Sequence, residues 1–179
     1  MVTADVSARL AWSDDAASIA RVQLAAWRDL YVDVLSPEVL ESLDADEVAE
    51  RWATSLTTPP DARIRVLVAL DRAEVRGFAL VHPSYDPDAD QVRDGEVGEF
   101  VVDPAHRGEG HGSRLLQAAM DTLAADQFTR VRWWVASTDD QLREFVTASG
   151  WEADGAHREL QDDAGHTVKQ VRLHSALAA

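Results

Sequence analysis

Cysteine is absent from this chain, and Lys169 is its only lysine. The lack of cysteine excludes disulfide bonds, thiolate metal sites and a cysteine nucleophile, so any group transfer has to be direct or to use another side chain. No apolar run approaches the roughly 20 residues that a membrane-spanning helix needs. The first residues, MVTADVSARLAW, contain neither the basic nor the apolar segment of a secretory signal, so we expect a cytoplasmic protein that does not bind membranes.

Positive charge is also scarce, because 17 arginine and lysine residues face 32 aspartate and glutamate residues, which gives a net charge of −15. This excess opposes binding to nucleic acid or to an anionic membrane, and it favours a cationic partner. A solvated, soluble surface explains the same charge without any partner. The length and the composition, 46% hydrophobic and 27% charged, predict one globular domain over residues 1–179.

One stretch, residues 96–123, predicts a strand, a glycine-rich turn and a helix in direct succession. Val97, Val101 and Val102 fit a buried strand, and Pro104 ends it because proline has no N–H to donate. After the turn at residues 107–112, apolar residues recur with helical spacing while polar residues take the other side. The pattern therefore indicates a helix that packs on one face.

This joint predicts an anion site, because the first N–H groups of a helix have no partners within the helix and carry a positive partial charge. A glycine loop lets a phosphate approach those groups closely. An ordinary flexible turn is the alternative. The loop is not a P-loop, since no Gly-Lys-Ser/Thr follows it, and no acidic residue closes the next strand as a dinucleotide-binding unit would require.

The joint resembles motif A of the GNAT acyltransferases, in which a strand ending in V-x-P leads to R/Q-x-x-G-x-G/A and a helix. Val102 and Pro104 match the first part, and Arg107, Gly110 and Gly112 match the second. The resemblance implies that acetyl-CoA is a co-substrate, that the loop amides hold its pyrophosphate, and that the strand end binds its pantetheine arm. The coenzyme-binding residues implied in this way are Val101, Val102, Arg107, Gly108, Glu109, Gly110, His111, Gly112, Ser113, Asp139 and Phe145.

The remaining elements follow the GNAT order along essentially the whole chain. The resemblance therefore implies an α/β (α+β) GNAT fold, with a mixed central sheet of about seven strands flanked by about four helices. Strands are predicted over residues 7–12, 64–70, 75–81, 96–102, 130–135, 151–160 and 167–173, and helical structure over residues 13–30, 36–56, 113–123 and 138–149.

Several helix ends can be predicted from capping residues. Ser36 and Asp44 are suited to begin helical segments, and Thr138 with Gln141 predicts a capping box before the last helix. Gly150 fits a left-handed residue that ends that helix. Four residues of the first helix form a stripe that we expect to pack on the sheet, namely Ala20, Leu24, Trp27 and Tyr31.

A second GNAT motif, V-x-x-x-N-x-x-A-x-x-F-Y-x-x-x-G-F, falls on residues 135–151 with three departures. Its asparagine is Asp139, its alanine is Leu142 and its tyrosine is Val146. In many family members this tyrosine protonates the departing thiolate, so Val146 weakens the prediction of catalysis. A coenzyme A thiol has a pKa near that of free cysteine, about 8.5, so the thiolate also leaves without a dedicated acid.

An amine acceptor has to lose a proton, which calls for a base near the thioester. Glu96 is our first candidate, because some GNAT members carry a glutamate at this position, counted back from Arg107, that acts through water. Glu99 is a second candidate, and it points to the opposite face unless a β-bulge intervenes. Strand-edge or solvated carboxylates explain both equally well. Tyr31 is a better substitute for the missing acid than Tyr85, because the first helical region lines the acceptor cleft in the family.

The histidines do not predict a metal site. His106 and His111 are five residues apart across a glycine turn, whereas a helical metal pair is four apart, so we expect both to be solvated and predict no metal.

The sequence thus predicts an N-acetyltransferase that moves an acetyl group from acetyl-CoA directly to a primary amine. The alternative is a coenzyme A-binding or regulatory module with weak or no activity, which the departures at Asp139 and Val146 motivate. A third reading is an interaction domain without a nucleotide site. The acceptor stays open among a small amine, an antibiotic, a peptide N-terminus and a protein lysine, and so does the oligomeric state, a homodimer included.

Overall fold

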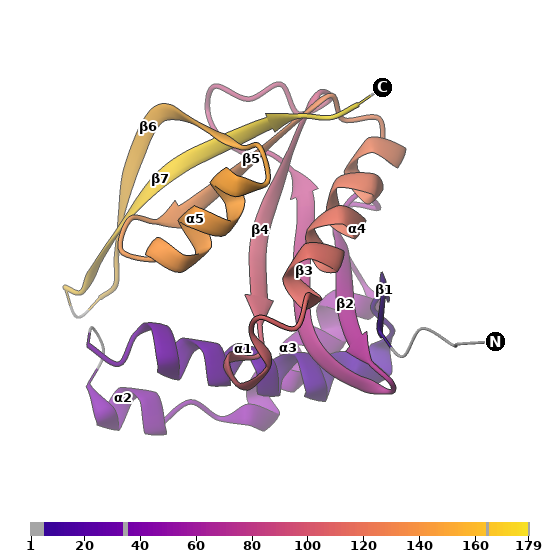
Figure 1. Ribbon diagram of the computed structural model, residues 1–179. Coiled ribbons are helices and arrows are strands. Elements are labelled where there is room, and N and C mark those ends of the chain that lie inside the picture. The colour runs from indigo at the N-terminus through magenta and orange to yellow at the C-terminus, as the bar shows by residue number, and fades with distance from the viewer. Residues whose placement is uncertain (1–5, 34–35, 164, 179) are drawn as a thin grey trace.

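A computed structural model describes residues 6–33, 36–163 and 165–178, which form one seven-stranded sheet with helices on both faces (Figure 1). The strand order is β1-β2-β3-β4-β5-β7-β6, with β4 and β5 parallel and the other neighbours antiparallel. The strands are β1 (Val6–Leu10), β2 (Arg65–Asp71), β3 (Glu74–Pro83), β4 (Asp94–Val102), β5 (Arg130–Ala136), β6 (Glu152–Gln161) and β7 (Thr167–Ala176). The helices are α1 (Ala16–Leu30), α2 (Pro37–Glu41), α3 (Ala45–Thr57), α4 (His111–Ala125) and α5 (Asp140–Ala148), with short 3-10 helices at Ser13–Asp15 and Pro104–His106.

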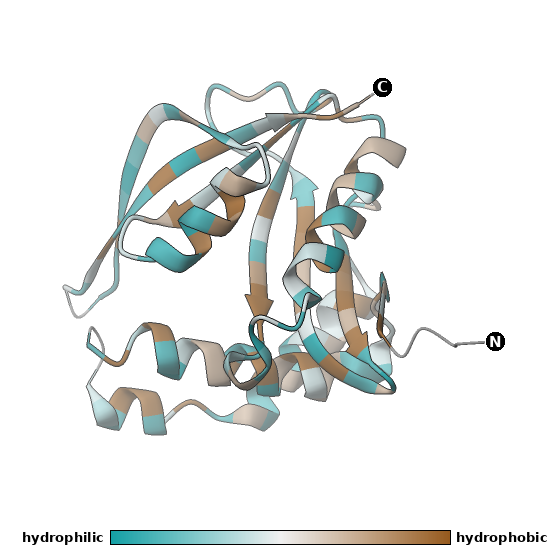
Figure 2. Ribbon diagram, in the orientation of Figure 1, coloured by the Kyte–Doolittle hydropathy of each residue, from teal (hydrophilic) through white to brown (hydrophobic). Residues whose placement is uncertain are grey.

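Each face of the sheet has its own hydrophobic core. On one face, Ile19 and Val22 of α1 pack with Phe78 and with the apolar side chains of β2, and Trp52 of α3 lies edge-on to Phe78. On the other face, α4 and α5 cover the middle of the sheet, where Leu115 and Val146 are fully buried. Hydrophobic and hydrophilic residues alternate along each helix, as expected for helices that cover a sheet (Figure 2).

The predicted mixed sheet is confirmed, and so are the helix starts at Ser36 and Asp44, whereas the start of the last helix differs from the prediction. The helical region predicted over residues 36–56 consists of α2 and α3, and Asp44 caps α3 by accepting hydrogen bonds from the N–H groups of Asp46 and Glu47. The capping box of Thr138 and Gln141 is wrong by one residue. Asp139 caps α5 instead, accepting a hydrogen bond of 3.0 Å from the N–H of Leu142. Among the described residues, no helix combines the length and apolar character that crossing a bilayer requires.

The sheet opens in its middle, between β4 and β5. These strands pair only from Asp94 with Arg130 to Val97 with Trp133, although β4 continues to Val102 and β5 to Ala136. On the far side, β4 stays paired with β3 up to Val102. The β5-facing backbone groups of residues 98–102 therefore have no strand partner in the part of the chain that the structure describes.

A β-bulge in β4 marks the point where the strands part. Val81 pairs with Val97 but Leu80 pairs with Glu99, which leaves Gly98 as an extra residue. A Cβ at Gly98 would lie 2.6 Å from Nε2 of His82, so any larger residue at this position would force the histidine ring to shift. The extra residue shifts the alternation of side chains by one position, which turns Glu99 toward α1.

Candidate active site

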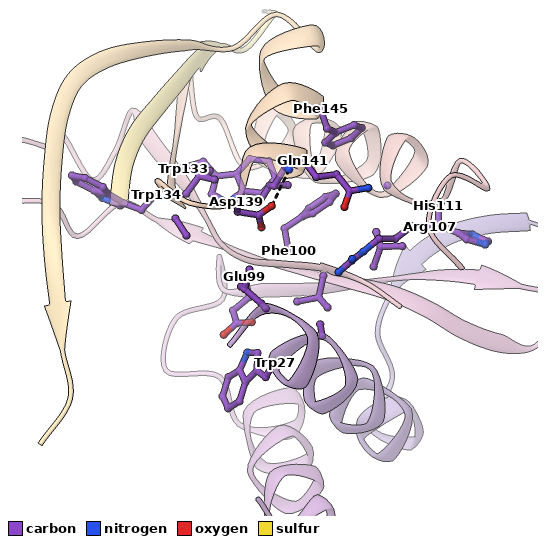
Figure 3. Close-up of a pocket in the computed structure, with 18 of the residues that line it drawn as sticks. Trp27, Glu99, Phe100, Arg107, His111, Trp133, Trp134, Asp139, Gln141 and Phe145 are labelled. Atoms are coloured by element: carbon purple, nitrogen blue, oxygen red, sulfur yellow. Dashed lines mark hydrogen bonds between the residues drawn. The ribbon is translucent and has the colours of Figure 1, made fainter. Parts of the chain in front are cut away.

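A cavity of about 560 Å³ lies where β4 and β5 separate. Figure 3 shows Arg107 and His111 at one end, Trp134 at the other, and Phe100 between them. The end of α1, the second half of β4, the glycine loop, β5 and the start of α5 supply the walls. Twelve of the fourteen residues predicted for the site line this cavity, namely Tyr31, Glu99, Val101, Val102, Arg107, Gly108, Gly110, His111, Gly112, Ser113, Asp139 and Phe145.

The glycine loop has the backbone conformation of an anion cradle. Gly108 and Gly110 have φ angles of +78° and +82°, which disfavour residues with a Cβ, and Gly110 is the N-cap of α4. Gly112 follows within the first turn, so the loop and the unpaired N–H groups of α4 both border the cavity. Such an end holds phosphate oxygens by hydrogen bonds and by its partial positive charge.

The charged side chains of this loop have partners within the protein. Arg107 donates a hydrogen bond of 2.8 Å to Asp29 at the end of α1. Glu109 does not line the cavity, and its carboxylate lies 3.2 Å from Nδ1 of His106 and 3.3 Å from Nε2 of His111. The prediction of a solvated His111 is wrong. His111 is the first residue of α4, and it is only 1% exposed.

Glu99 is held in the cavity wall by a chain of hydrogen bonds from two helices. Nε1 of Trp52 donates to Oε1 of Gln23 at 2.8 Å, and Nε2 of Gln23 donates to Glu99 at 3.3 Å. Burial raises the pKa of Glu99 above its ordinary value, and the hydrogen bond from Gln23 opposes that rise. A carboxylate with a raised pKa in a cavity has the properties of a general base that works near neutral pH.

Glu96 occupies a different place, although the bulge puts it on the same face as Glu99. It does not line the cavity, it is 8% exposed, and it accepts a hydrogen bond of 2.8 Å from the hydroxyl of Ser84. Burial raises the pKa of Glu96 as well, while Ser84 and the nearby His82 partly offset that effect. Glu96 therefore cannot take a proton directly from a group in the cavity; the proton would have to be relayed by a water molecule or another side chain.

Tyr31 lines the cavity at the end of α1, whereas Tyr85 is 56% exposed and stacks on His82 outside it. Burial raises the pKa of Tyr31, and the charges of Glu99 and Asp139 add to the rise. This hydroxyl therefore keeps its proton at neutral and mildly alkaline pH. Val146 is fully buried in the core beside α4, so its position in the second motif does not face the cavity.

The sequence prediction missed part of the cavity wall, most clearly Trp27, Trp134 and Gln170. Trp27 and Tyr31 belong to the stripe expected to pack on the sheet, but only its earlier members, Ala20 and Leu24, are fully buried. The stripe runs past the point where the sheet opens, so its last turn faces the cavity instead. The sequence of β5 could have indicated Trp134, because this residue falls between the buried Trp133 and Val135 and so points to the opposite face of the strand.

Among the described residues, no group of three or more histidine, cysteine, aspartate or glutamate side chains is placed to bind a metal. The cavity brings together a glycine loop at a helix start, an unpaired strand edge, the half-buried carboxylate of Glu99 and the protonated phenol of Tyr31.

Comparisons with known proteins agree with this geometry. A family model described as the acetyltransferase (GNAT) family matches residues 24–151. The fold is similar to yncA from Salmonella typhimurium, solved with its cofactor acetyl-CoA, with a TM-score of 0.70, 18% identity and coverage of 97% of this chain and 95% of that one. It is also similar to the PaiA N-acetyltransferase from Thermoplasma acidophilum in complex with coenzyme A, with a TM-score of 0.71, 15% identity and coverage of 96% and 98%.

Curated relatives match over shorter stretches. The mycothiol acetyltransferase of Thermobispora bispora is 43% identical over 58 residues, which are 32% of this chain and 17% of that protein. The mycothiol acetyltransferase of Nocardiopsis dassonvillei is 33% identical over 95 residues, or 52% of this chain and 26% of that protein. The matched stretches thus cover about a quarter or less of these two relatives.

Proposed function

This chain belongs to the acetyltransferase (GNAT) family, and from that premise we propose that it transfers the acetyl group of acetyl-CoA directly to a primary amine. The observation that carries the proposal is the position of Glu99, a half-buried carboxylate in the wall of a cavity that is also bordered by the glycine loop. The names of the curated relatives do not extend to the acceptor of this chain, because the matched stretches cover too little of those proteins.

The residues present fit coenzyme A as a co-substrate. The loop of Gly108, Gly110 and Gly112 would hold the pyrophosphate at the start of α4, and the unpaired edge of β4 up to Val102 would hydrogen-bond the amides of the pantetheine arm. Arg107 would exchange its partner Asp29 for a phosphate oxygen. Acetyl-CoA supplies a thioester, whose acetyl group passes to the amine nitrogen as the C–S bond breaks.

Two side chains of the cavity would move the protons. We propose that Glu99 takes the proton that the amine loses, since it lines the cavity directly and its raised pKa matches that task. Glu96 is the second candidate and would act through water. Tyr31 would donate its hydroxyl proton or a hydrogen bond to the departing sulfur, in the role that Val146 cannot perform.

Paired substitutions test which glutamate is the base. With acetyl-CoA and a panel of primary amines, we expect Glu99→Gln to lower kcat by about 10²–10⁴, the usual contribution of a general base, while Glu96→Gln changes it by less than about tenfold. The readout is release of the free coenzyme A thiol together with the acetylated product. Calorimetric titration with acetyl-CoA controls for binding and should give similar affinities for both variants. A large loss in Glu96→Gln alone would instead assign the base to Glu96.

The departures at Asp139 and Val146 favour one other function, a coenzyme A-binding module that does not catalyse transfer. The same measurements separate the two. Tight binding of acetyl-CoA without amine-dependent release of thiol would support the module, whereas amine-dependent release would exclude it. No binding at all would contradict both functions and leave a domain without a nucleotide site.

A further inference from the structure

The end of the cavity away from the glycine loop combines negative charge with aromatic rings. Glu99 and Asp139 line the cavity and both act electrostatically on Tyr31, which places the phenol within the field of two carboxylates. Trp27 and Trp134 add aromatic faces, and Figure 3 shows Glu99 reaching toward Trp27 while Asp139 lies beside the start of α5. Carboxylates and aromatic faces are the groups that bind an ammonium ion.

Positive side chains are missing from the same wall. Among the described residues that line the cavity, Arg107 is the only arginine or lysine, and it belongs to the glycine loop and pairs with Asp29. The residues outside the described ranges contain no arginine or lysine either. Nothing on this wall therefore offers the bidentate partner that a substrate carboxylate requires.

The arginines behind this end of the cavity are already engaged. Arg132 and Arg172 form ion pairs with Asp86 and Asp88. Arg158 stacks on Trp134, with its guanidinium carbon 4.3 Å from the ring centroid, and its Nε donates to Gln170 at 2.8 Å. Arg158 does not line the cavity, but it contacts Trp134 and Gln170, which do. If a substrate carboxylate does bind at this end, Arg158 is therefore the arginine that would have to bind it.

We propose that the acceptor is a cationic amine without a carboxylate group, whose ammonium is received by Asp139 and Glu99 and whose carbon skeleton lies against Trp27 and Trp134. This inference rests on the proposed function and narrows its acceptor. An amino acid would bring its own carboxylate toward two others without a counter-ion, at a cost in electrostatic and desolvation energy. A decarboxylated amine avoids that cost, and the net charge of −15 attracts it.

Matched acceptor pairs test this inference, because each pair differs only in the carboxylate. The pairs are tryptamine and tryptophan, tyramine and tyrosine, and cadaverine and lysine. We expect kcat/KM to be at least tenfold higher for the amine in each pair. Basicity cannot produce this preference, since α-amino groups of amino acids are less basic than alkylamines and are deprotonated to a larger fraction at a given pH.

Substitutions at Asp139 and its neighbour locate the origin of the preference. Asp139→Asn keeps a side chain that can cap α5 but removes the charge, so we expect the amine to amino acid ratio to fall at least threefold. Asp140→Asn is the matched control, because Asp140 is exposed and does not line the cavity, and it should leave the ratio unchanged. Calorimetric titration of the coenzyme A complex with tryptamine and tryptophan gives the same comparison without turnover.

Equal or higher kcat/KM for the amino acids would overturn the inference while leaving the acetyltransferase proposal intact. If Arg158→Met then abolished the turnover of amino acids, Arg158 would be the carboxylate site. An unchanged ratio in Asp139→Asn would likewise remove Asp139 from acceptor recognition. Absence of thiol release with every acceptor, despite binding of acetyl-CoA, would contradict the proposed function itself and the inference with it.

Discussion

Gln23 donates a hydrogen bond to Glu99 and opposes the rise in its pKa, although Gln23 does not line the cavity. Gln23 is 5% exposed, and its amide accepts a hydrogen bond from Trp52 of α3 while donating one to the carboxylate on β4. The hydrogen bond favours the ionised form and so opposes the effect of burial on the pKa of Glu99. Gln23 is therefore a positioning residue whose effect should appear in the pH dependence of the reaction.

Gln23→Leu should raise the pKa of Glu99 further, because the carboxylate loses its donor while staying buried. A base is active when deprotonated, so the acidic limb of the kcat/KM profile should move to higher pH by about one unit, the value of a hydrogen bond to a charged group. Trp52→Phe should move the limb less in the same direction, since it keeps the ring against Phe78 and removes only the indole donor. A limb that stays in place in both variants would show that Glu99 does not govern it.

At the scale of elements, the bulge in β4 decides which side chains reach the cavity. Without the extra residue at Gly98, the alternation of the strand would turn Glu99 to the face covered by α4 and α5. The bulge also coincides with the separation of β4 from β5, because their pairing stops at Val97 and Trp133. The position of one glycine thus links the direction of Glu99 to the opening of the sheet.

Gly98→Ala tests this link, because its Cβ would lie 2.6 Å from Nε2 and 3.0 Å from Cδ2 of His82. We expect a loss of about 1–3 kcal/mol in the free energy of unfolding, the usual cost of overpacking, and at least a tenfold fall in kcat/KM as Glu99 moves. The double variant Gly98→Ala/His82→Ala should recover most of the stability, since the clash is with that side chain. Denaturant unfolding of both single variants and the double variant measures the coupling. Additive losses would mean that the Cβ contact is not the cause.

At the scale of the whole molecule, an ionic network built around the buried Arg132 and Arg172 joins the two halves of the sheet. β4 and β5 share only a short parallel ladder, and the loop between β3 and β4 adds ionic contacts across it. Asp86 and Asp88 of that loop pair with Arg132 on β5 and Arg172 on β7, and Arg172 also pairs with Asp154 on β6 at 2.7 Å. Arg132 is 4% exposed, so its end of these ion pairs lies within the protein interior.

Arg172→Met should lower the free energy of unfolding by about 3 kcal/mol at pH 7, because it removes one partner of a buried ionic network. Lys169→Met on the same strand is the control, since its pair with Glu159 is exposed and should contribute less than about 1 kcal/mol. Thermal unfolding of both variants beside the parent protein measures the difference. Equal effects of the two substitutions would contradict a structural role for the network.

The same network predicts a loss of stability in acid. Hydrogen bonds from Arg172 and then Arg132 hold the pKa of Asp88 well below its ordinary value. A carboxyl group with a depressed pKa contributes stability above its unfolded pKa, near 3.9, and that contribution is lost as the pH falls toward the folded pKa. The parent protein should therefore become less stable below about pH 4, and Arg172→Met should lose less over the same interval.

The sequence by itself determined the glycine-loop end of the cavity, which we propose binds the coenzyme. The strand end, the glycine turn and the helix start are contiguous, so residues from Val101 to Ser113 carry their geometry locally, in two positive φ angles and the free N–H groups of α4. The order of the elements was predictable for the same reason, because hydrophobic periodicity and capping residues act over one or two turns, whereas the mixed sheet was expected from the resemblance to the GNAT family.

The tertiary structure alone decided the other end of the cavity, where we propose that the acceptor binds. Whether Glu99 faces the cavity depends on the pairing of β4 with β3, which places Gly98 under His82. Whether Trp27 and Tyr31 pack on the sheet or line the cavity depends on where β4 and β5 separate. These outcomes arise from contacts between residues far apart in the chain, and local periodicity contains no information about them.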